Sequence, residues 1–288
     1  MQTDKITPRI YKKIHSKQLK TSGFNRVMSL YSNKQLGLSS NYFKGKVCAD
    51  FGGGNGSGAI NLINLGAKKV YLIDLNDSFL KIKNKKYKDK IIHCKENIIK
   101  TSFKKNYFDF VLCSNAIHHT SQPSKVLKEI FRVLNGNGKS LISVNGKYGL
   151  IGKIINKVIK VEYKNNPTIK RLIDELLNNK LKRYNKFFFK RFTIKEKFFA
   201  KELIKKFDDD FILTLKDRIL SPKYVEFSEK KFKHDLKKIG FKRITRIKSN
   251  YVKYDNIRFL LAPFYYEYKN ILSKALYGEG NIKLFLSK

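Results

Sequence analysis

A glycine-rich turn between an apolar run and a helical pattern is the feature that most constrains this sequence. The run Val47–Phe51 ends in Gly52-Gly53-Gly54-Asn55-Gly56-Ser57-Gly58, and residues 59–65 then have helical spacing. Glycine permits a positive φ and lets a ligand approach the backbone where a side chain would block it. The first turn of a helix also offers free N–H groups and the positive end of its dipole to anionic ligand atoms. The segment therefore predicts a ligand-binding turn from a strand into a helix.

Strand and helix patterns alternate on short loops through residues 47–146. Apolar runs predict strands over 47–51, 70–74, 91–94, 108–113 and 140–144, and helical patterns lie between them at 59–65, at about 78–87 and after residue 123. Such alternation implies βαβ units and a parallel sheet with helices on both faces. We therefore expect an α/β fold built on a doubly wound, mostly parallel sheet.

The pattern changes after residue 146. Residues 147–227 show helical patterns only, including a helix expected over 150–162, whereas a helix over 228–240 and an alternating strand over 241–247 restore the α/β pattern. We expect four parts. They are an N-terminal helical segment (1–46), a ligand-binding core (47–146), a helical cap or insertion (147–227) and a C-terminal completion of the α/β core (228–288).

Two cofactors fit the turn. Gly54 to Ala59 satisfies the G-x-G-x-x-G/A pattern of dinucleotide binding, and Asp74 follows twenty residues later, as an NAD(P)-dependent oxidoreductase requires. Because the first two strands of such a sheet end side by side, the Asp74 carboxylate is placed to accept hydrogen bonds from two ribose hydroxyls. Both cofactors carry such hydroxyls, so Asp74 does not discriminate between the two cofactors.

A second pattern favours the other cofactor. An acidic residue, any residue and then alternating glycines are met by Asp50, Gly52, Gly54 and Gly56. The carboxylate of Asp50 can engage an ammonium group, which S-adenosylmethionine carries and NAD lacks, and it would repel a pyrophosphate. The turn therefore favours S-adenosylmethionine over NAD(P).

At this point the sequence resembles the class I S-adenosylmethionine-dependent methyltransferases. The resemblance rests on four segments that are similar to the first two motifs of the family, to its approach to strand four and to its turn before strand five: residues 47–52, 70–74, 103–109 and 132–138. It covers residues 47–146. It implies a Rossmann-like fold with a seven-stranded sheet, S-adenosylmethionine as cofactor and methyl transfer as the activity.

The resemblance also assigns cofactor contacts. The family commonly places an acidic residue after strand three to accept from the adenine amino group, and here Asn97 stands at that position with Glu96 beside it. The Asn97 carbonyl oxygen can accept the same bond without a charge. Ser114 ends the fourth strand and is expected to border the cofactor. The expected cofactor-binding residues are therefore Asp50, Gly52, Gly54, Gly56, Asp74, Asn97 and Ser114.

His118 and His119 follow the fourth strand and should border the transferred methyl group, because ligands in a doubly wound sheet lie beyond the carboxyl ends of the strands. A neutral imidazole at either position can remove a proton from a hydroxyl or amine nucleophile. The alternative is a histidine that only caps the next helix or packs on the cofactor. The five histidines lack metal-ligand spacing and the three cysteines form no CxxC pair, so no metal is expected.

The chain is very basic, with 62 Lys+Arg against 23 Asp+Glu and a formal net charge of +39. The excess is spread along the chain, and compositional bias toward lysine explains part of it. A field of this size attracts polyanions, namely non-specific nucleic acid, an anionic membrane surface or a phosphorylated substrate. Arginine is scarce and no zinc-finger or RNP-type signature is present, so sequence-specific nucleic-acid binding is not expected. Lysines line one side of the helix expected after residue 150, which suits a membrane interface or a solvated cap helix.

These features together predict an S-adenosylmethionine-dependent methyltransferase that acts on an O, N or C atom of a small-molecule or lipid-like substrate. The alternatives are an NAD(P)-dependent oxidoreductase and a non-catalytic RNA- or membrane-binding protein on the same scaffold. The sequence shows no signal-like segment and no apolar window of membrane-spanning length. We therefore expect a cytoplasmic protein, with a peripheral position at the membrane as an option.

Overall fold

The computed structural model describes residues 11–12, 32–77, 85–154, 160–177, 219–220, 225–247 and 270–288. The chain divides into two compact units. The first, called here the core unit, comprises Met1–Lys147, Pro222–Asn250 and Glu279–Lys288. The second, the helical unit, comprises Tyr148–Ser221 and Tyr251–Gly278. The four-part division expected from the sequence stays a prediction.

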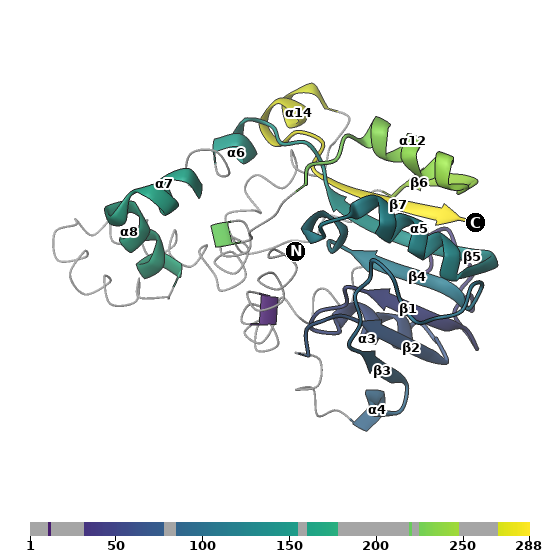
Figure 1. The fold of residues 1–288 in the computed structure, drawn as a ribbon. Coiled ribbons are helices and arrows are strands. Elements are labelled where there is room, and N and C mark those ends of the chain that lie inside the picture. Colours follow the sequence, from purple (N-terminus) through teal and green to yellow (C-terminus); the bar gives the residue numbers. More distant parts are fainter. Residues whose placement is uncertain are drawn as a thin grey trace, which may run out of the picture. The chain divides into compact units, whose positions relative to one another are not determined.

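The core unit is built on one seven-stranded sheet with the order β3-β2-β1-β4-β5-β7-β6 (Figure 1). Strands β1 to β5 run parallel, while β7 is antiparallel to both β5 and β6. The strands are β1 Val47–Phe51, β2 Lys69–Ile73, β3 Ile91–Cys94, β4 Phe108–Ser114, β5 Leu134–Asn145, β6 Arg243–Arg246 and β7 Asn281–Ser287. The expected doubly wound, mostly parallel sheet is confirmed.

Two features of the sheet differ from the residue-by-residue expectation. Strand β5 begins at Leu134 rather than at 140, because Leu134 already pairs with Phe108 and the register then shifts so that Lys139 pairs with Phe110. The intervening turn, residues 135–138, is therefore an irregularity within a strand. Strand β7 was expected only as part of an unspecified completion of the core, and it supplies the antiparallel member between β5 and β6.

Helices cover both faces of the sheet, and each face has its own apolar core. Among the described residues, the helices of this unit include α3 Ser57–Asn64, α4 Lys85–Lys88, the 3-10 turn η2 Ile117–His119, α5 Pro123–Val133 and α12 Glu229–Ile239. On one face, Val126 and Ile130 of α5 and Phe232 of α12 join a buried cluster, and on the other Ile60 and Leu62 of α3 do so. Burial of each such side chain contributes about 2 kcal/mol. Of the helix expected over 78–87, residues 78–84 lie outside the described residues.

The order of the strands defines where a ligand can bind. Strand β1 lies between β2 and β4, so the chain adds strands on one side of β1 up to β3 and then on the other side from β4 onward. Ligands of doubly wound folds lie beyond the carboxyl ends of the strands at this switch point. In this chain the glycine-rich residues 52–58 and residues 115–119 follow β1 and β4 there.

The helical unit contains α6 Leu150–Lys153, α7 Lys160–Asn165, α8 Pro167–Leu177 and α14 Ile271–Tyr277. The helix expected over 150–162 is seen as α6 and the start of α7, with residues 155–159 outside the described ranges. Asn270 caps α14, since its Oδ1 accepts from the backbone N–H groups of Leu272 and Ser273 at 2.8 and 3.2 Å. Within the described parts of the chain, no helix has the length and apolar character needed to cross a membrane.

Candidate functional site

The glycine turn, residues 52–58, joins β1 to α3 through a backbone that only glycine adopts easily. Gly52, Gly54 and Gly56 have φ of 70°, 52° and 82°. At Gly52 a side chain would also collide with the helix-entry segment after β4, because a Cβ there would lie 2.3 Å from the Cβ of Ala116. The turn thus holds the start of α3 against the end of β4, which is the form expected of a ligand-binding turn.

Asp50 lies beneath this turn. Its side chain is 2% exposed, and a Cβ on Gly53 or Gly58 would lie only 2.7 or 2.6 Å from its Oδ2. Among the described residues, Oδ2 has no hydrogen-bond partner. Burial raises the pKa of Asp50 to about 7, with the Ala59 backbone N–H lowering it and Asp74 raising it further. The contact between Asp50 and a cofactor ammonium stays a prediction, and the carboxyl would have to be reached through the turn.

Sequence reasoning missed the part that Gly53 and Gly58 play. Both were seen as members of a glycine-rich loop, whereas the structure shows that their missing side chains make the space that the Asp50 carboxyl fills. The signal was the acidic residue itself, because a buried carboxyl three residues before one glycine and eight before another needs room between strand and helix.

Asp74 ties the end of β2 to the glycine turn. Its Oδ2 accepts from the Gly54 N–H at 2.8 Å and its Oδ1 accepts from the Asn76 N–H at 2.7 Å. Burial raises the pKa of Asp74, while these two N–H donors and His93 lower it, and the net shift is upward. Each carboxylate oxygen keeps a lone pair, so the geometry leaves acceptors for ribose hydroxyls beside the turn.

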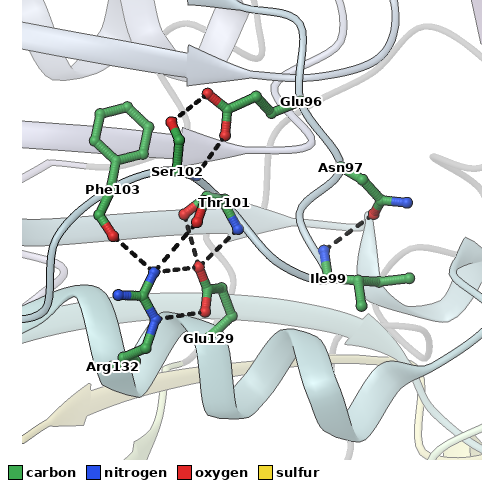
Figure 2. Close-up of polar contacts among 8 residues, drawn as sticks. All are labelled: Glu96, Asn97, Ile99, Thr101, Ser102, Phe103, Glu129 and Arg132. Carbon is green, nitrogen blue, oxygen red and sulfur yellow. Dashed lines mark hydrogen bonds and ion pairs between the residues drawn. The ribbon is translucent and has the colours of Figure 1, made fainter.

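Asn97 and Glu96 lie in the loop between β3 and β4, and both already bond within that loop (Figure 2). The Asn97 Oδ1 accepts from the Ile99 N–H at 3.0 Å, which is an Asx turn. The two Glu96 oxygens accept from the N–H and hydroxyl of Ser102, each at 2.7 Å. Asn97 is exposed, and one lone pair of its carbonyl oxygen is used locally. Its contact with adenine stays a prediction.

Helix α5 fixes the same loop from below through a buried carboxylate (Figure 2). Glu129 Oε1 accepts from the N–H and hydroxyl of Thr101 at 2.8 and 2.7 Å. Arg132 donates to both Glu129 oxygens, at 2.7 and 2.6 Å, and to the Phe103 carbonyl at 2.8 Å. Burial raises the pKa of Glu129, but Arg132 and Thr101 outweigh it and hold that pKa below its ordinary value. Sequence analysis did not single out this pair, although its i, i+3 spacing on a helix was visible.

The two histidines after β4 occupy different environments. His118 is 1% exposed, and its Nε2 lies 3.1 Å from the Asn145 Nδ2. Burial, and then the neighbouring His119, lower the pKa of His118 well below its ordinary value, so this ring is neutral at pH 7. The His119 ring is only partly buried, and the Tyr11 hydroxyl lies 2.9 Å from its Nε2. Of the two predicted bases, His119 is the more accessible, and the catalytic role of either histidine stays a prediction.

A polar cluster forms where β4, β5 and β7 meet. Ser114 and Ser143 place their hydroxyl oxygens 3.1 Å apart, and Ser143 also accepts from the Asn115 N–H at 3.0 Å. Asn281 donates its Nδ2 to the Asn115 Oδ1 at 2.8 Å. Ser114 is the last residue of β4, and its contact with the cofactor stays a prediction. Asn115 was missed, and its φ of 55° places it in the left-handed region, which asparagine adopts more readily than most residues.

The described residues contain no group of three His, Cys, Asp or Glu side chains that could hold a metal ion. They do fit an adenosyl cofactor that carries an ammonium group. The turn presents glycines at the start of α3, Asp74 offers acceptors beside it, and Asp50 holds a buried carboxyl oxygen without a partner in the described chain.

Comparisons with known proteins agree with this geometry. Residues 49–142 match the family described as Methyltransferase domain. The chain is 30% identical over 106 residues to the ubiquinone/menaquinone biosynthesis C-methyltransferase UbiE of Serratia proteamaculans, which covers 34% of this chain and 42% of that protein. It is 28% identical over 131 residues to UbiE of Proteus mirabilis, covering 43% and 51%. The chain thus spans about half the length of these relatives.

Solved structures share the fold. One is a methyltransferase in complex with the Trm112 methyltransferase activator of Haloferax volcanii, with a TM-score of 0.55, 10% identity and coverage of 98% of this chain and 96% of that one. Another is an S-adenosylmethionine-dependent methyltransferase of Thermotoga maritima, with a TM-score of 0.50, 14% identity and coverage of 98% and 99%. Residues 49–142 thus resemble the methyltransferase domain family in sequence, and the chain shares the fold of solved methyltransferases.

Proposed function

We propose that this protein transfers a methyl group from S-adenosylmethionine to an O, N or C atom of a small-molecule or lipid-like substrate. The observation that carries the proposal is the link between Asp74 and the glycine turn, in which a carboxylate bonded to the Gly54 N–H stands beside the first turn of α3. A ribose needs acceptors at this point and the rest of the cofactor needs an open backbone, and both are present. The family match supports the same conclusion.

The residues of the site position reactants rather than form bonds with them. The bound cofactor would supply a sulfonium-activated methyl group, which needs little covalent help. With the cofactor bound, Asp74 would accept from the ribose hydroxyls, the glycine turn would leave room for the chain attached to the ribose, and the β3–β4 loop would border the adenine. Holding acceptor and methyl group in line then lowers the barrier by fixing their orientation.

His119 is the residue best placed to take a proton from an acceptor hydroxyl or amine. It lies in η2 after the carboxyl end of β4 and is partly exposed. The centre of its ring lies 4.1 Å from the centre of the neutral His118 ring. His118 is buried against Asn145 and supports the position of His119. A carbon acceptor, as in the reaction for which the UbiE relatives are named, would also be within the reach of this arrangement.

We further propose a cytoplasmic location, supported by three free thiols at Cys48, Cys94 and Cys113. The oxidoreductase alternative has less support, because the buried Asp50 under the turn would oppose a pyrophosphate placed above it. A non-catalytic scaffold would keep the cofactor site without transferring methyl groups.

Isothermal titration calorimetry tests the cofactor. S-Adenosylmethionine and S-adenosylhomocysteine should bind with one site per chain, and NAD and NADP should give no binding heat. Tight NAD binding without an adenosylhomocysteine signal would show that the proposal is wrong. Incubation with methyl-labelled cofactor and a metabolite extract then tests the chemistry. Cofactor binding without label transfer to any extracted compound would identify the non-catalytic scaffold.

A further inference from the structure

The end of the core sheet opposite the cofactor site carries a line of cations. Strands β1 to β5 start at this end, β6 starts there as well, and the antiparallel β7 ends there, since Ser287 pairs with both Lys139 and Arg243. Loops that enter the strands are also joined here, as the Lys68 N–H donates to the Lys46 carbonyl and the Val70 N–H to the Lys90 carbonyl. With neighbouring strands about 4.8 Å apart, seven strands make an edge about 29 Å long.

Basic side chains follow this edge from end to end. We call the set the cation edge, and its members are Lys44, Lys46, Lys68, Lys69, Lys88, Lys90, Lys104, Lys105, Lys139, Lys242, Arg243 and Lys288. The acidic side chains in the same strand ends are Asp89 and Asp109, and Asp109 accepts from the Val47 N–H and the Asn135 side chain. Across the described ranges, no ion pair involves a member of the cation edge.

Several members are close enough to repel one another. The ammonium groups of Lys46 and Lys139 each lie 4.8 Å from the centre of the Tyr42 ring. Burial lowers the pKa of Lys139, and Arg243 and Lys46 lower it further. Burial and Lys105 lower the pKa of Lys288 in the same way. Cations assembled in this way leave a positive field that a polyanion would neutralise.

A general excess of lysine does not explain the line, because the described residues at the other end of the same sheet are nearly balanced in charge. Among the described residues in the strand ends and loops beyond the carboxyl ends, the acidic ones are Asp50, Asp74, Asp77, Glu96, Glu226, Glu229 and Glu279, and the basic ones are Lys12, Lys95, Lys100, Lys147, Arg246 and Lys283. Compositional bias would enrich both ends alike. One end thus concentrates cations that have no ion pair within the described residues, and this points to a partner for that end.

We propose that the cation edge binds the phosphate backbone of single-stranded nucleic acid without reading its sequence. A line of cations about 29 Å long suits a chain of phosphates. Tyr107 lies beside Lys104 and Lys105 and is 42% exposed, which offers a face on which a base can stack. The predominance of lysine over arginine fits phosphate contacts rather than bidentate base contacts.

The geometry favours nucleic acid over a membrane, and it separates this surface from the methyl-transfer site. Of the large hydrophobic side chains that are exposed, those near this edge are Tyr107 and Ile92, so there is little to insert into a bilayer. Strands β1 and β2 are five residues long, which places the edge about 15 Å from the glycine turn. The bound strand would therefore anchor the enzyme and would not be its methylated substrate.

The test compares two variants of the full chain that remove the same charge. The edge variant carries K44Q, K68Q, K90Q and K242Q, and the matched control carries K95Q, K125Q, K128Q and K147Q, all at exposed lysines. Fluorescence anisotropy with a labelled 20-nucleotide polyuridine gives the dissociation constant from 50 to 300 mM salt. Each lost phosphate contact lowers the slope of log K against log salt by about 0.7. For the edge variant we expect the magnitude of this slope to fall by about 3 and the affinity at 100 mM salt to fall at least tenfold. For the control we expect the dissociation constant to change less than threefold.

Equal losses in both variants, or no binding of polyuridine by the wild type at 50 mM salt, would overturn the proposal. A second measurement is sedimentation with vesicles of phosphatidylserine and phosphatidylcholine. Binding to these vesicles but not to polyuridine would also overturn the proposal. Calorimetry with S-adenosylhomocysteine keeps this test separate from the proposed function, because the edge variant should bind it as the wild type does. Thermal melting at the same salt checks that both variants fold.

Discussion

At the carboxyl end of the core sheet two acidic side chains are held against the glycine turn, whereas at the amino end most of the lysines are exposed and, within the described residues, without ion pairs. Asp50 is buried beneath the turn, and Asp74 accepts from two backbone N–H groups. Lys44, Lys68 and their neighbours face solvent. The same strands, 4 to 12 residues long, join the two ends, so the difference does not follow from overall composition. Buried charges fix the geometry of loops, while exposed charges create a field and leave geometry alone.

The largest expected effect concerns Asp50 and pH. Its folded pKa is raised to about 7, whereas the ordinary value is about 3.9, so folding favours the protonated form. That contribution to stability is fully present below about pH 4 and is lost as the pH rises through about 7. Three pKa units correspond to about 4 kcal/mol. Asp50→Asn has no such titration. Between pH 4 and pH 7 the free energy of unfolding of the wild type should therefore fall by about this amount relative to that of Asp50→Asn.

Urea unfolding across that pH range measures the Asp50 effect. The edge variant is the reference from the other end of the sheet, since it changes exposed lysines only, and its curve should follow the wild type within about 0.5 kcal/mol. If the difference in free energy of unfolding between Asp50→Asn and the wild type instead stays constant from pH 4 to 7, the Asp50 carboxyl is not held in a closed space. The contrast between the two ends of the sheet is then weaker.

Glu129→Ala should destabilise the protein by about 3 kcal/mol, because it leaves the Thr101 N–H, the Thr101 hydroxyl and the Arg132 guanidinium without their buried acceptor. Glu129→Gln keeps one acceptor oxygen and should cost about half as much. Chemical unfolding of both variants measures the difference, and S-adenosylhomocysteine should bind more weakly to Glu129→Ala since its β3–β4 loop is loosened. Equal stability of the two variants would refute the anchoring role.

Asp74→Ala should weaken S-adenosylhomocysteine binding at least tenfold, because it removes an acceptor of charged hydrogen bonds worth about 1.5–3 kcal/mol each. Asp74→Asn keeps one acceptor and should lie between Asp74→Ala and the wild type. Polyuridine binding should stay within twofold of the wild type in both variants, since Asp74 lies at the far end of β2 from the cation edge. An unchanged dissociation constant for adenosylhomocysteine in Asp74→Ala would reject the ribose role.

Most of the sheet could be predicted from sequence because its signals are local. Each parallel strand of the core contains a short apolar run, and the glycine turn identifies where β1 meets α3. The start of β5 was missed because Leu134 joins the sheet through an irregular register with β4, and the pairing of β7 depends on partners far away in the chain. Local patterns do not carry such long-range pairings.

The proximity of Asp74 to the glycine turn was predictable, because the first two strands of such a sheet end side by side. The cofactor contacts of these residues stay predictions. The roles of Gly53, Gly58 and Glu129 were not found, because they depend on what occupies the space across a strand or beneath a loop. The difference between His118 and His119 was equally hidden, since adjacent residues in a sequence give no indication that one ring is 1% exposed and the other is not.

A competition titration tests the separation of the two ends most directly. The dissociation constant of S-adenosylhomocysteine is measured by calorimetry with the wild-type protein, first alone and then with saturating polyuridine in 50 mM salt. Because the glycine turn and the cation edge lie at opposite ends of the sheet, we expect the two constants to agree within twofold. Displacement of adenosylhomocysteine by polyuridine would show that both ligands bind at one end and would contradict the account.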